Sequence, residues 1–148
     1  MKVILRLQPN AKPVFQPKRP APYAALTVVD QEIEHLQQVG VLQPVNCSAR
    51  AAPIVAIKKA TGKVRICANL STSLNAALDT HQYPLPVPED LFAKLNGGTC
   101  FKQLYLSDSY LQIEVAEESR ELLTINTHSG LFQFTRLPFG VKTAPTIC

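Results

Sequence analysis

Twelve prolines in a chain of 148 residues restrict its fold more than any other feature, because most of them lie in two clusters. Proline fixes φ and lacks a backbone N–H, so it breaks helices and is excluded from central strands. Both clusters are therefore predicted to be extended connectors, with regular structure between and beyond them. The first cluster comprises Pro9, Pro13, Pro17, Pro20 and Pro22, and the second comprises Pro84, Pro86 and Pro88.

Periodicity predicts a helix and then a hairpin between the two clusters. Apolar residues recur at helical spacing from Leu26 to Leu36, and Gly40 follows, so residues 25–39 are predicted to form a helix. Residues 52–58 and 63–68 are rich in β-branched side chains and flank a Thr-Gly turn, which predicts a β-hairpin. The tip of that hairpin is cationic and carries Lys58, Lys59, Lys63 and Arg65.

The remainder of the chain alternates between short helical and extended patterns. Together with the helix and hairpin, these patterns predict an α+β fold. Residues 88–95 begin with proline and two acids and end before Gly97-Gly98, which is typical of a short helix. Strands are predicted at 100–106, 111–115, 122–126 and 131–135.

The composition is 46% hydrophobic and 18% charged, which excludes a disordered tail. The net charge of +4 is uneven: residues 1–75 carry ten cations and three acids, whereas residues 76–148 carry five cations and eight acids. A basic first half suits a polyanionic partner such as nucleic acid, although solvated lysines on an ordinary surface would give the same pattern.

No feature of the sequence indicates secretion, a membrane span or a zinc site. The early apolar run is too short for a signal peptide, and no later run approaches the roughly 20 residues of a span. The four cysteines, Cys47, Cys67, Cys100 and Cys148, form no CxxC pair. We therefore expect an intracellular protein, in cytoplasm or nucleus, with free thiols and no membrane partner.

Short blocks along the whole chain resemble, in order, the reverse transcriptases of gypsy-type LTR retrotransposons. One such block alone would be weak evidence, and the ordered series is strong. The blocks are GVLQPV at 40–45, APIV at 52–55, GKVRIC at 62–67, QYPLP at 82–86, EDLF at 89–92, LNGG at 95–98, LTINTH at 123–128, GLF at 130–132, RLPFG at 136–140 and AP at 144–145.

The resemblance implies a right-hand polymerase fold of which this chain holds the fingers and the first part of the palm. It implies an extended basic arm at 1–22 and a partial reverse transcriptase domain at 23–148. Within that domain the fingers would comprise 25–78 and 113–143, and the palm 79–112 and 144–148. The family's second palm strand pair, with its paired aspartates, is expected to lie beyond Cys148, so the domain is predicted to be truncated.

The metal site implied by the resemblance is altered in this sequence. The family carries a metal-binding aspartate in a Leu-Asp-Leu-Ser context, where this chain reads LYLS at 104–107, so Tyr105 stands in its place. A phenol with a pKa of about 10 is neutral at pH 7 and is a poor ligand for Mg²⁺, the family's cofactor. The nearby Asp108 is not expected to compensate. We therefore predict no catalytic residue and no bound metal, with residue 105 facing a cleft and Leu104 and Leu106 pointing into the core.

The nucleotide-binding positions of the family are better preserved. By resemblance, Arg65 and Lys59 (or Lys58) would contact the triphosphate, and Tyr110 would lie under the sugar. The alternative is that the cations are solvated and the aromatic residues belong to the core. The full set predicted from the resemblance is Lys59, Arg65, Asp108, Tyr110, Phe139 and Gly140, with deoxynucleoside triphosphate and an RNA or DNA template–primer as partners.

Other polar residues receive no site role. Asp79 and Glu114 are predicted to be surface carboxylates, and the three histidines are predicted to be isolated polar residues: His35, His81 and His128. Two further departures from the family pattern are Asn69, where an aspartate is usual, and Arg50, where tryptophan is common.

Three functions remain open from the sequence. The favoured one is a degenerate N-terminal fragment of a retrotransposon RNA-directed DNA polymerase without activity of its own. The second is a nucleic-acid-binding remnant that grips a strand through its basic fingers. The third is an active reverse transcriptase of which these residues are one piece.

Overall fold

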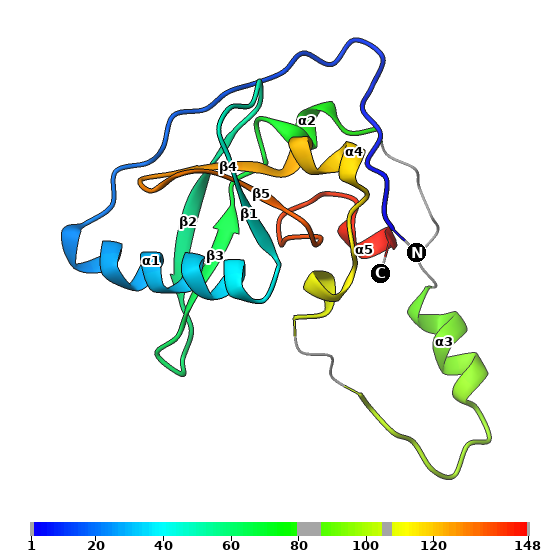
Figure 1. The fold of residues 1–148 in the computed structure, drawn as a ribbon. Coiled ribbons are helices and arrows are strands. Elements are labelled where there is room, and N and C mark those ends of the chain that lie inside the picture. The colour runs from blue at the N-terminus through cyan, green and yellow to red at the C-terminus, as the bar shows by residue number, and fades with distance from the viewer. Residues whose placement is uncertain (1, 80–86, 105–107, 148) are drawn as a thin grey trace.

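The computed structural model describes residues 2–79, 87–104 and 108–147, which form an α+β fold around one five-stranded mixed sheet (Figure 1). The strand order is β1-β5-β4-β2-β3. This confirms the predicted fold class. The elements are α1 (Tyr23–Gln38), β1 (Leu42–Val45), β2 (Ala52–Lys58), β3 (Val64–Ala68), α2 (Leu74–Ala77), α3 (Pro88–Leu95), a 3-10 turn (Ser109–Gln112), α4 (Glu117–Arg120), a second 3-10 turn (Glu121–Leu123), β4 (Thr124–Thr127), β5 (Gly130–Phe134) and α5 (Ala144–Ile147).

The predicted hairpin is confirmed as β2 and β3, which pair antiparallel with Ile57 opposite Arg65. Its turn is closed by two backbone hydrogen bonds, from the Lys59 N–H to the Lys63 carbonyl (2.7 Å) and from the Gly62 N–H to the Lys59 carbonyl (2.9 Å). Gly62 has φ +84°, a left-handed conformation that glycine adopts without steric cost. The hairpin therefore holds its lysines at a defined, exposed tip.

The predicted helix at 25–39 is confirmed as α1, which begins two residues earlier. Val29, Ile33 and Leu36 are buried on one face, as the helical spacing predicts. Figure 1 shows α1 lying across the sheet, and α1 contacts β1 and β3. This placement brings the other side of α1 toward the hairpin tip.

Strand β1 was not predicted, because Pro44 lies inside it. Within the described structure β1 is an edge strand that pairs with β5, placing Pro44 opposite Phe132. A proline is tolerated there because one side of an edge strand makes no ladder hydrogen bonds. On the other side of β5, β4 pairs antiparallel with it and then runs parallel to β2 over only two residue pairs.

The N-terminal arm at residues 2–22 contains no helix or longer strand, and it contributes to the core. Val3 and Leu5 are both buried, at 7% exposure. The Val3 N–H donates to the Glu114 carbonyl at 2.8 Å, and the Leu5 N–H donates to the Ser119 hydroxyl at 2.9 Å. The arm therefore closes one side of the sheet domain, and the boundary at residue 22 stays a prediction.

The segment at 87–104 lies apart from the sheet in Figure 1. The predicted helix at 88–95 is confirmed as α3, but none of its residues is buried, and Phe92 is 72% exposed. The strand predicted at 100–106 is wrong for its described residues, which adopt no regular structure and find no partner strand in the described part of the chain. The expectation that Leu104 points into the core is also wrong, since it is 74% exposed.

The strand predicted at 111–115 is wrong for a different reason. Asp108 has φ +47°, which turns the chain into the 3-10 turn Ser109–Gln112 in place of an extended run. Only isolated bridges remain, at Glu114 and Val115. Among the described residues, no helix combines the length and apolarity needed to cross a membrane.

Candidate functional site

A pocket of about 250 Å³ opens between α1, the turn end of the β2–β3 hairpin and the segments around Asp108 and Phe139. Four of the six residues predicted for the nucleotide site line it: Lys59, Arg65, Asp108 and Phe139. A second hollow of about 520 Å³ adjoins it at the hairpin tip and shares Lys59 and Asp108. The fold therefore assembles, from three separate parts of the chain, most of the residues that the resemblance selected.

Arg65 is the central cation of the pocket. Its guanidinium carbon lies 4.5 Å from the centroid of the Phe139 ring, a cation–π contact that holds the planar group in one orientation. The Arg65 Nε atom is buried and has no hydrogen-bond partner within the described part of the protein. A buried, unpaired donor costs free energy, so this nitrogen favours an acceptor that enters the pocket.

Tyr110 supports this arrangement without lining the pocket. Its ring meets the Phe139 ring edge to face, with centroids 5.2 Å apart and an interplanar angle of 74°. This geometry is favoured by the opposed charge of ring edges and faces. Tyr110 therefore packs against the same ring that contacts Arg65.

Asp108 and Lys59 close the pocket at its outer side. Their charged atoms, Lys59 Nζ and Asp108 Oδ1, are 4.0 Å apart, and both side chains are close to half exposed. Such an exposed pair contributes little stability and is easily separated. Asp108 adopts the left-handed conformation that aspartate tolerates better than most residues.

Gly140 lies beside the pocket but does not line it. Its φ is +97°, and a Cβ added there would lie 3.1 Å from the Ala68 carbonyl oxygen at the end of β3. The Asn75 side chain fixes this loop, because its Nδ2 donates to the Gly140 carbonyl (2.7 Å) and its Oδ1 accepts from the Lys142 N–H (2.8 Å). Sequence reasoning missed Asn75, since no local pattern links residue 75 to residue 140.

Tyr105, predicted at the family's metal position, lies outside the described residues, as does His81. The carboxylates that line the pocket are Glu32 and Asp108, and Asp108 faces Lys59. In the described parts of the chain, no three His, Cys, Asp or Glu side chains gather as metal ligands. These residues do not fit the two-Mg²⁺ centre that the resemblance implies for the family.

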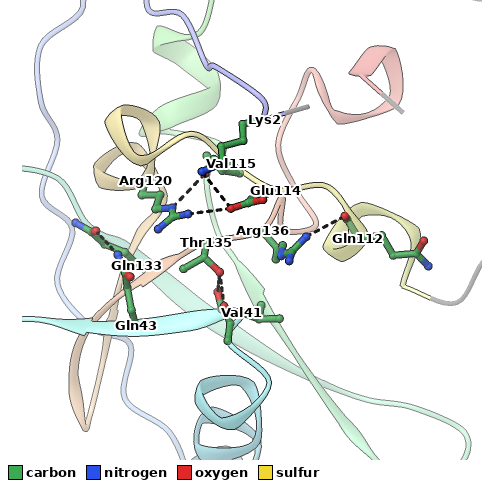
Figure 2. A network of polar contacts seen from close by, with 11 residues as sticks. Lys2, Val41, Gln43, Gln112, Glu114, Val115, Arg120, Gln133, Thr135 and Arg136 are labelled. Carbon is green, nitrogen blue, oxygen red and sulfur yellow. Dashed lines mark hydrogen bonds and ion pairs between the residues drawn. The ribbon is translucent and has the colours of Figure 1, made fainter.

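Glu114, predicted to be a surface carboxylate, lies between two cations, Lys2 and Arg120 (Figure 2). Its Oε1 is 3.5 Å from Lys2 Nζ and 3.5 Å from Arg120 Nη2. Arg120 also donates from Nε to the Val115 carbonyl at 3.1 Å. These contacts fasten the N-terminal arm and the chain that follows Tyr110 to one another.

His128, predicted to be isolated, instead joins the β4–β5 turn to α1. Its Nε2 is 2.6 Å from Asp30 Oδ1, and the Ser129 hydroxyl donates to the same oxygen at 2.7 Å. The hydrogen bond from Ser129, together with the contact with His128, holds the pKa of the Asp30 carboxyl below its ordinary value. The ionised carboxylate therefore stabilises the fold at neutral pH.

Asp30→Asn is expected to lower the melting temperature at pH 7. A carboxyl whose folded-state pKa is lowered contributes stability above its unfolded pKa of about 3.9, and that contribution disappears as the pH falls through the folded-state value. The difference between wild type and variant should therefore persist down to about pH 4 and shrink below it. Thermal denaturation across this range measures it, with Glu34→Gln on the same helix as control; an undiminished difference in acid would contradict the assignment.

No protein-family model matches the chain. It is 48% identical over 146 residues to an uncharacterized protein, K02A2.6, of Caenorhabditis elegans, covering 97% of this chain and 11% of that protein. It is 29% identical over 126 residues to the transposon Tf2-3 polyprotein of Schizosaccharomyces pombe, covering 85% of this chain and 9% of the polyprotein. It is 28% identical over 147 residues to the retrovirus-related Pol polyprotein from transposon 412 of Drosophila melanogaster, covering 95% and 12%.

Among solved structures, the fold matches the protease-reverse transcriptase of prototype foamy virus with a TM-score of 0.75 and 22% identity. The match covers 93% of this chain and 18% of the viral one. The fold is therefore that of a segment of a reverse transcriptase. The chain is thus similar in sequence to segments of transposon polyproteins and in fold to a segment of this viral protein. The chain spans about a tenth of the length of the curated relatives it matches.

Proposed function

We propose that these residues are a fingers-and-palm segment of a gypsy-type retrotransposon RNA-directed DNA polymerase, unable to polymerise DNA by itself but able to bind the phosphates of a nucleotide. The observation that carries the binding proposal is Arg65, whose buried Nε lacks a partner while Phe139 holds the guanidinium at the pocket. Polyproteins of transposons among the relatives support the polymerase origin.

The chemistry of the pocket suits a phosphate chain. A guanidinium presents several N–H donors in one plane and pairs with two phosphate oxygens at once. Lys59 adds a mobile point charge 4.0 Å from Asp108, and an entering phosphate would compete with that carboxylate for it. The Tyr110 ring, which by resemblance would lie under the sugar, packs against the Phe139 ring on the pocket wall.

The proposed lack of polymerase activity has a separate basis. Nucleotidyl transfer by this family depends on two Mg²⁺ ions held by aspartates. Tyr105 stands where one of those aspartates is expected, and a neutral phenol does not replace a carboxylate as a magnesium ligand.

A second candidate function is binding of a nucleic acid strand without chemistry. Lys58, Lys59 and Lys63 are all exposed at the hairpin tip, where they could contact a phosphate backbone. Such binding would weaken steeply with salt, because it releases counterions from the nucleic acid. Weak salt dependence together with saturable nucleotide binding would favour the pocket.

The binding proposal is tested by titrating the protein with dTTP in the presence of EDTA and following chemical shifts. Arg65→Gln is expected to weaken binding by roughly ten- to hundredfold, because hydrogen bonds to a charged group contribute about 1.5–3 kcal/mol. Arg6→Gln is the matched control, since it removes the same charge from an exposed side chain that does not line the pocket. Equal losses in both variants, or no saturable shift in the wild type, would refute the proposal.

A further inference from the structure

Helix α1 supplies two ionisable side chains to the pocket that the resemblance did not select. Glu32 and His35 line the pocket of about 250 Å³ and also the adjoining hollow of about 520 Å³. They are three residues apart on one helix, so their side chains lie on the same face. His35 was predicted to be an isolated polar residue, and the structure places it on the wall of the pocket.

The formal charges that line both hollows cancel when His35 is neutral. In the pocket, Lys59 and Arg65 face Glu32 and Asp108. In the adjoining hollow, Lys59 and Lys63 face the same two carboxylates. The segment at 134–139 contributes only uncharged residues to the lining, and Gln112 is neutral.

A polyphosphate entering either hollow therefore meets paired charges and little net positive potential. A change of charge on a single side chain, His35 or Glu32, is therefore enough to make the lining positive. Imidazole is the side chain that ordinarily changes charge between pH 5 and 8. Protonation of His35 would change the formal sum in each hollow from zero to +1, and neutralisation of Glu32 would have the same effect.

We propose that Glu32 and His35 make this a pH-dependent phosphate-binding site, in which protonated His35 adds a cation for the ligand and ionised Glu32 weakens binding. The inference deepens the proposed function and rests on it. One added unit charge at contact distance near a protein surface should change affinity by about three- to tenfold. The site then binds polyphosphate most tightly in mildly acidic solution.

The test uses inorganic tripolyphosphate as ligand, with calorimetry in EDTA at about pH 5 and about pH 8, which bracket the histidine range. The ratio of wild-type affinity to His35→Gln affinity at each pH cancels the ligand's own titration. This ratio should be about three to ten at the lower pH and close to one at the higher pH. Glu32→Gln should bind about three- to tenfold more tightly than wild type at pH 8.

Two matched controls separate a local effect from a change in overall charge. His128→Gln removes a histidine whose partner is Asp30, and Glu34→Gln removes an exposed carboxylate of α1 that does not line the pocket. Both controls should follow the wild type at each pH. Circular dichroism melts identify any variant that fails to fold, and Glu32→Asn and His35→Asn then replace it.

The outcomes distinguish a failure of the pH-dependence proposal from a failure of the proposed phosphate binding. Tripolyphosphate binding that depends on Arg65 but shows the same wild-type to His35→Gln ratio at both pH values overturns the inference and leaves the proposed function intact. Equal pH effects in His35→Gln and His128→Gln overturn it as well. Absence of binding by the wild type at either pH overturns both.

Discussion

A chimera that joins these 148 residues to the remainder of a polymerase-active relative is expected to extend primers roughly a thousandfold faster with Tyr105→Asp than with Tyr105 in place. The aspartate would restore a hard oxygen ligand for Mg²⁺ at the position where the family carries one. Primer extension on an RNA template with Mg²⁺ measures the difference. The 148 residues alone should incorporate nothing with either Mg²⁺ or Mn²⁺.

Tyr23→Asp is the matched control for the chimera, because Tyr23 is 92% exposed and lies at the start of α1. It makes the same chemical change without approaching the pocket and should leave activity unchanged. Equal activity of the chimeras with and without the Tyr105→Asp substitution would show that the metal position has been misassigned. Equal inactivity would locate the defect elsewhere in the fingers, with Arg50 and Asn69 as the first positions to revert.

The hydrogen bonds of Asn69 do not require an asparagine at this position. The Asn69 Oδ1 accepts a hydrogen bond from the Ser71 hydroxyl at 2.7 Å, and the Asn69 backbone N–H donates to the Pro53 carbonyl at 2.8 Å. An aspartate could accept the same bond from Ser71. Reversion of Asn69 should therefore preserve the loop while restoring the family's charge.

Leu5→Ala is expected to lower the free energy of unfolding by about 2–5 kcal/mol, the usual range for truncating a buried leucine. Leu5 is only 7% exposed and belongs to the same core cluster as Phe134 and Leu137. The substitution removes apolar contacts and leaves a cavity that the sheet domain cannot easily close. Urea denaturation followed by circular dichroism measures the change.

The preceding residue provides an internal control. Ile4 is 56% exposed, so Ile4→Ala should change the free energy of unfolding by no more than about 0.5 kcal/mol. A similar, small effect of both substitutions would mean that the arm is not packed in solution. A large effect of both would indicate that the arm's backbone pairing, and not the burial of Leu5, decides its contribution.

The local elements of the fold could be predicted from the sequence because their signals are local. The spacing of Val29, Ile33 and Leu36 indicated both α1 and its buried face. The hairpin followed from two β-branched runs around Gly62, and α3 followed from its proline start and glycine end. In each case the residues that specify the element lie within the element or next to it.

The elements that depend on distant partners could not be predicted in this way. β1 contains Pro44 and exists because β5 pairs with one of its edges. The two-residue parallel contact between β2 and β4 leaves no pattern in either segment. The residues at 100–104 alternate as in a strand, yet the described structure provides no partner strand for them. Alternation alone was therefore misleading.

The residues of the candidate site also differ in whether the sequence could identify them. Arg65, Lys59 and Phe139 were selected because motifs resembling a known family mark them, and the fold brings them to one pocket. Whether they bind a nucleotide stays a prediction. Glu32 and His35 carry no motif, and only the packing of α1 beside the hairpin places them there.

The N-terminal arm pairs with residues 114–119, and this long separation in sequence affects how the arm behaves during synthesis. Leu5 donates its N–H to a serine 114 residues later, so the arm leaves the ribosome long before its partner exists. At about 5–20 residues per second, this interval lasts roughly 6–23 s. During that time the apolar stretch at 3–5 is exposed to chaperones and to neighbouring nascent chains. Its flanking charges, Lys2 and Arg6, are the kind of residues that limit strand-to-strand aggregation, so they protect the arm before it can fold.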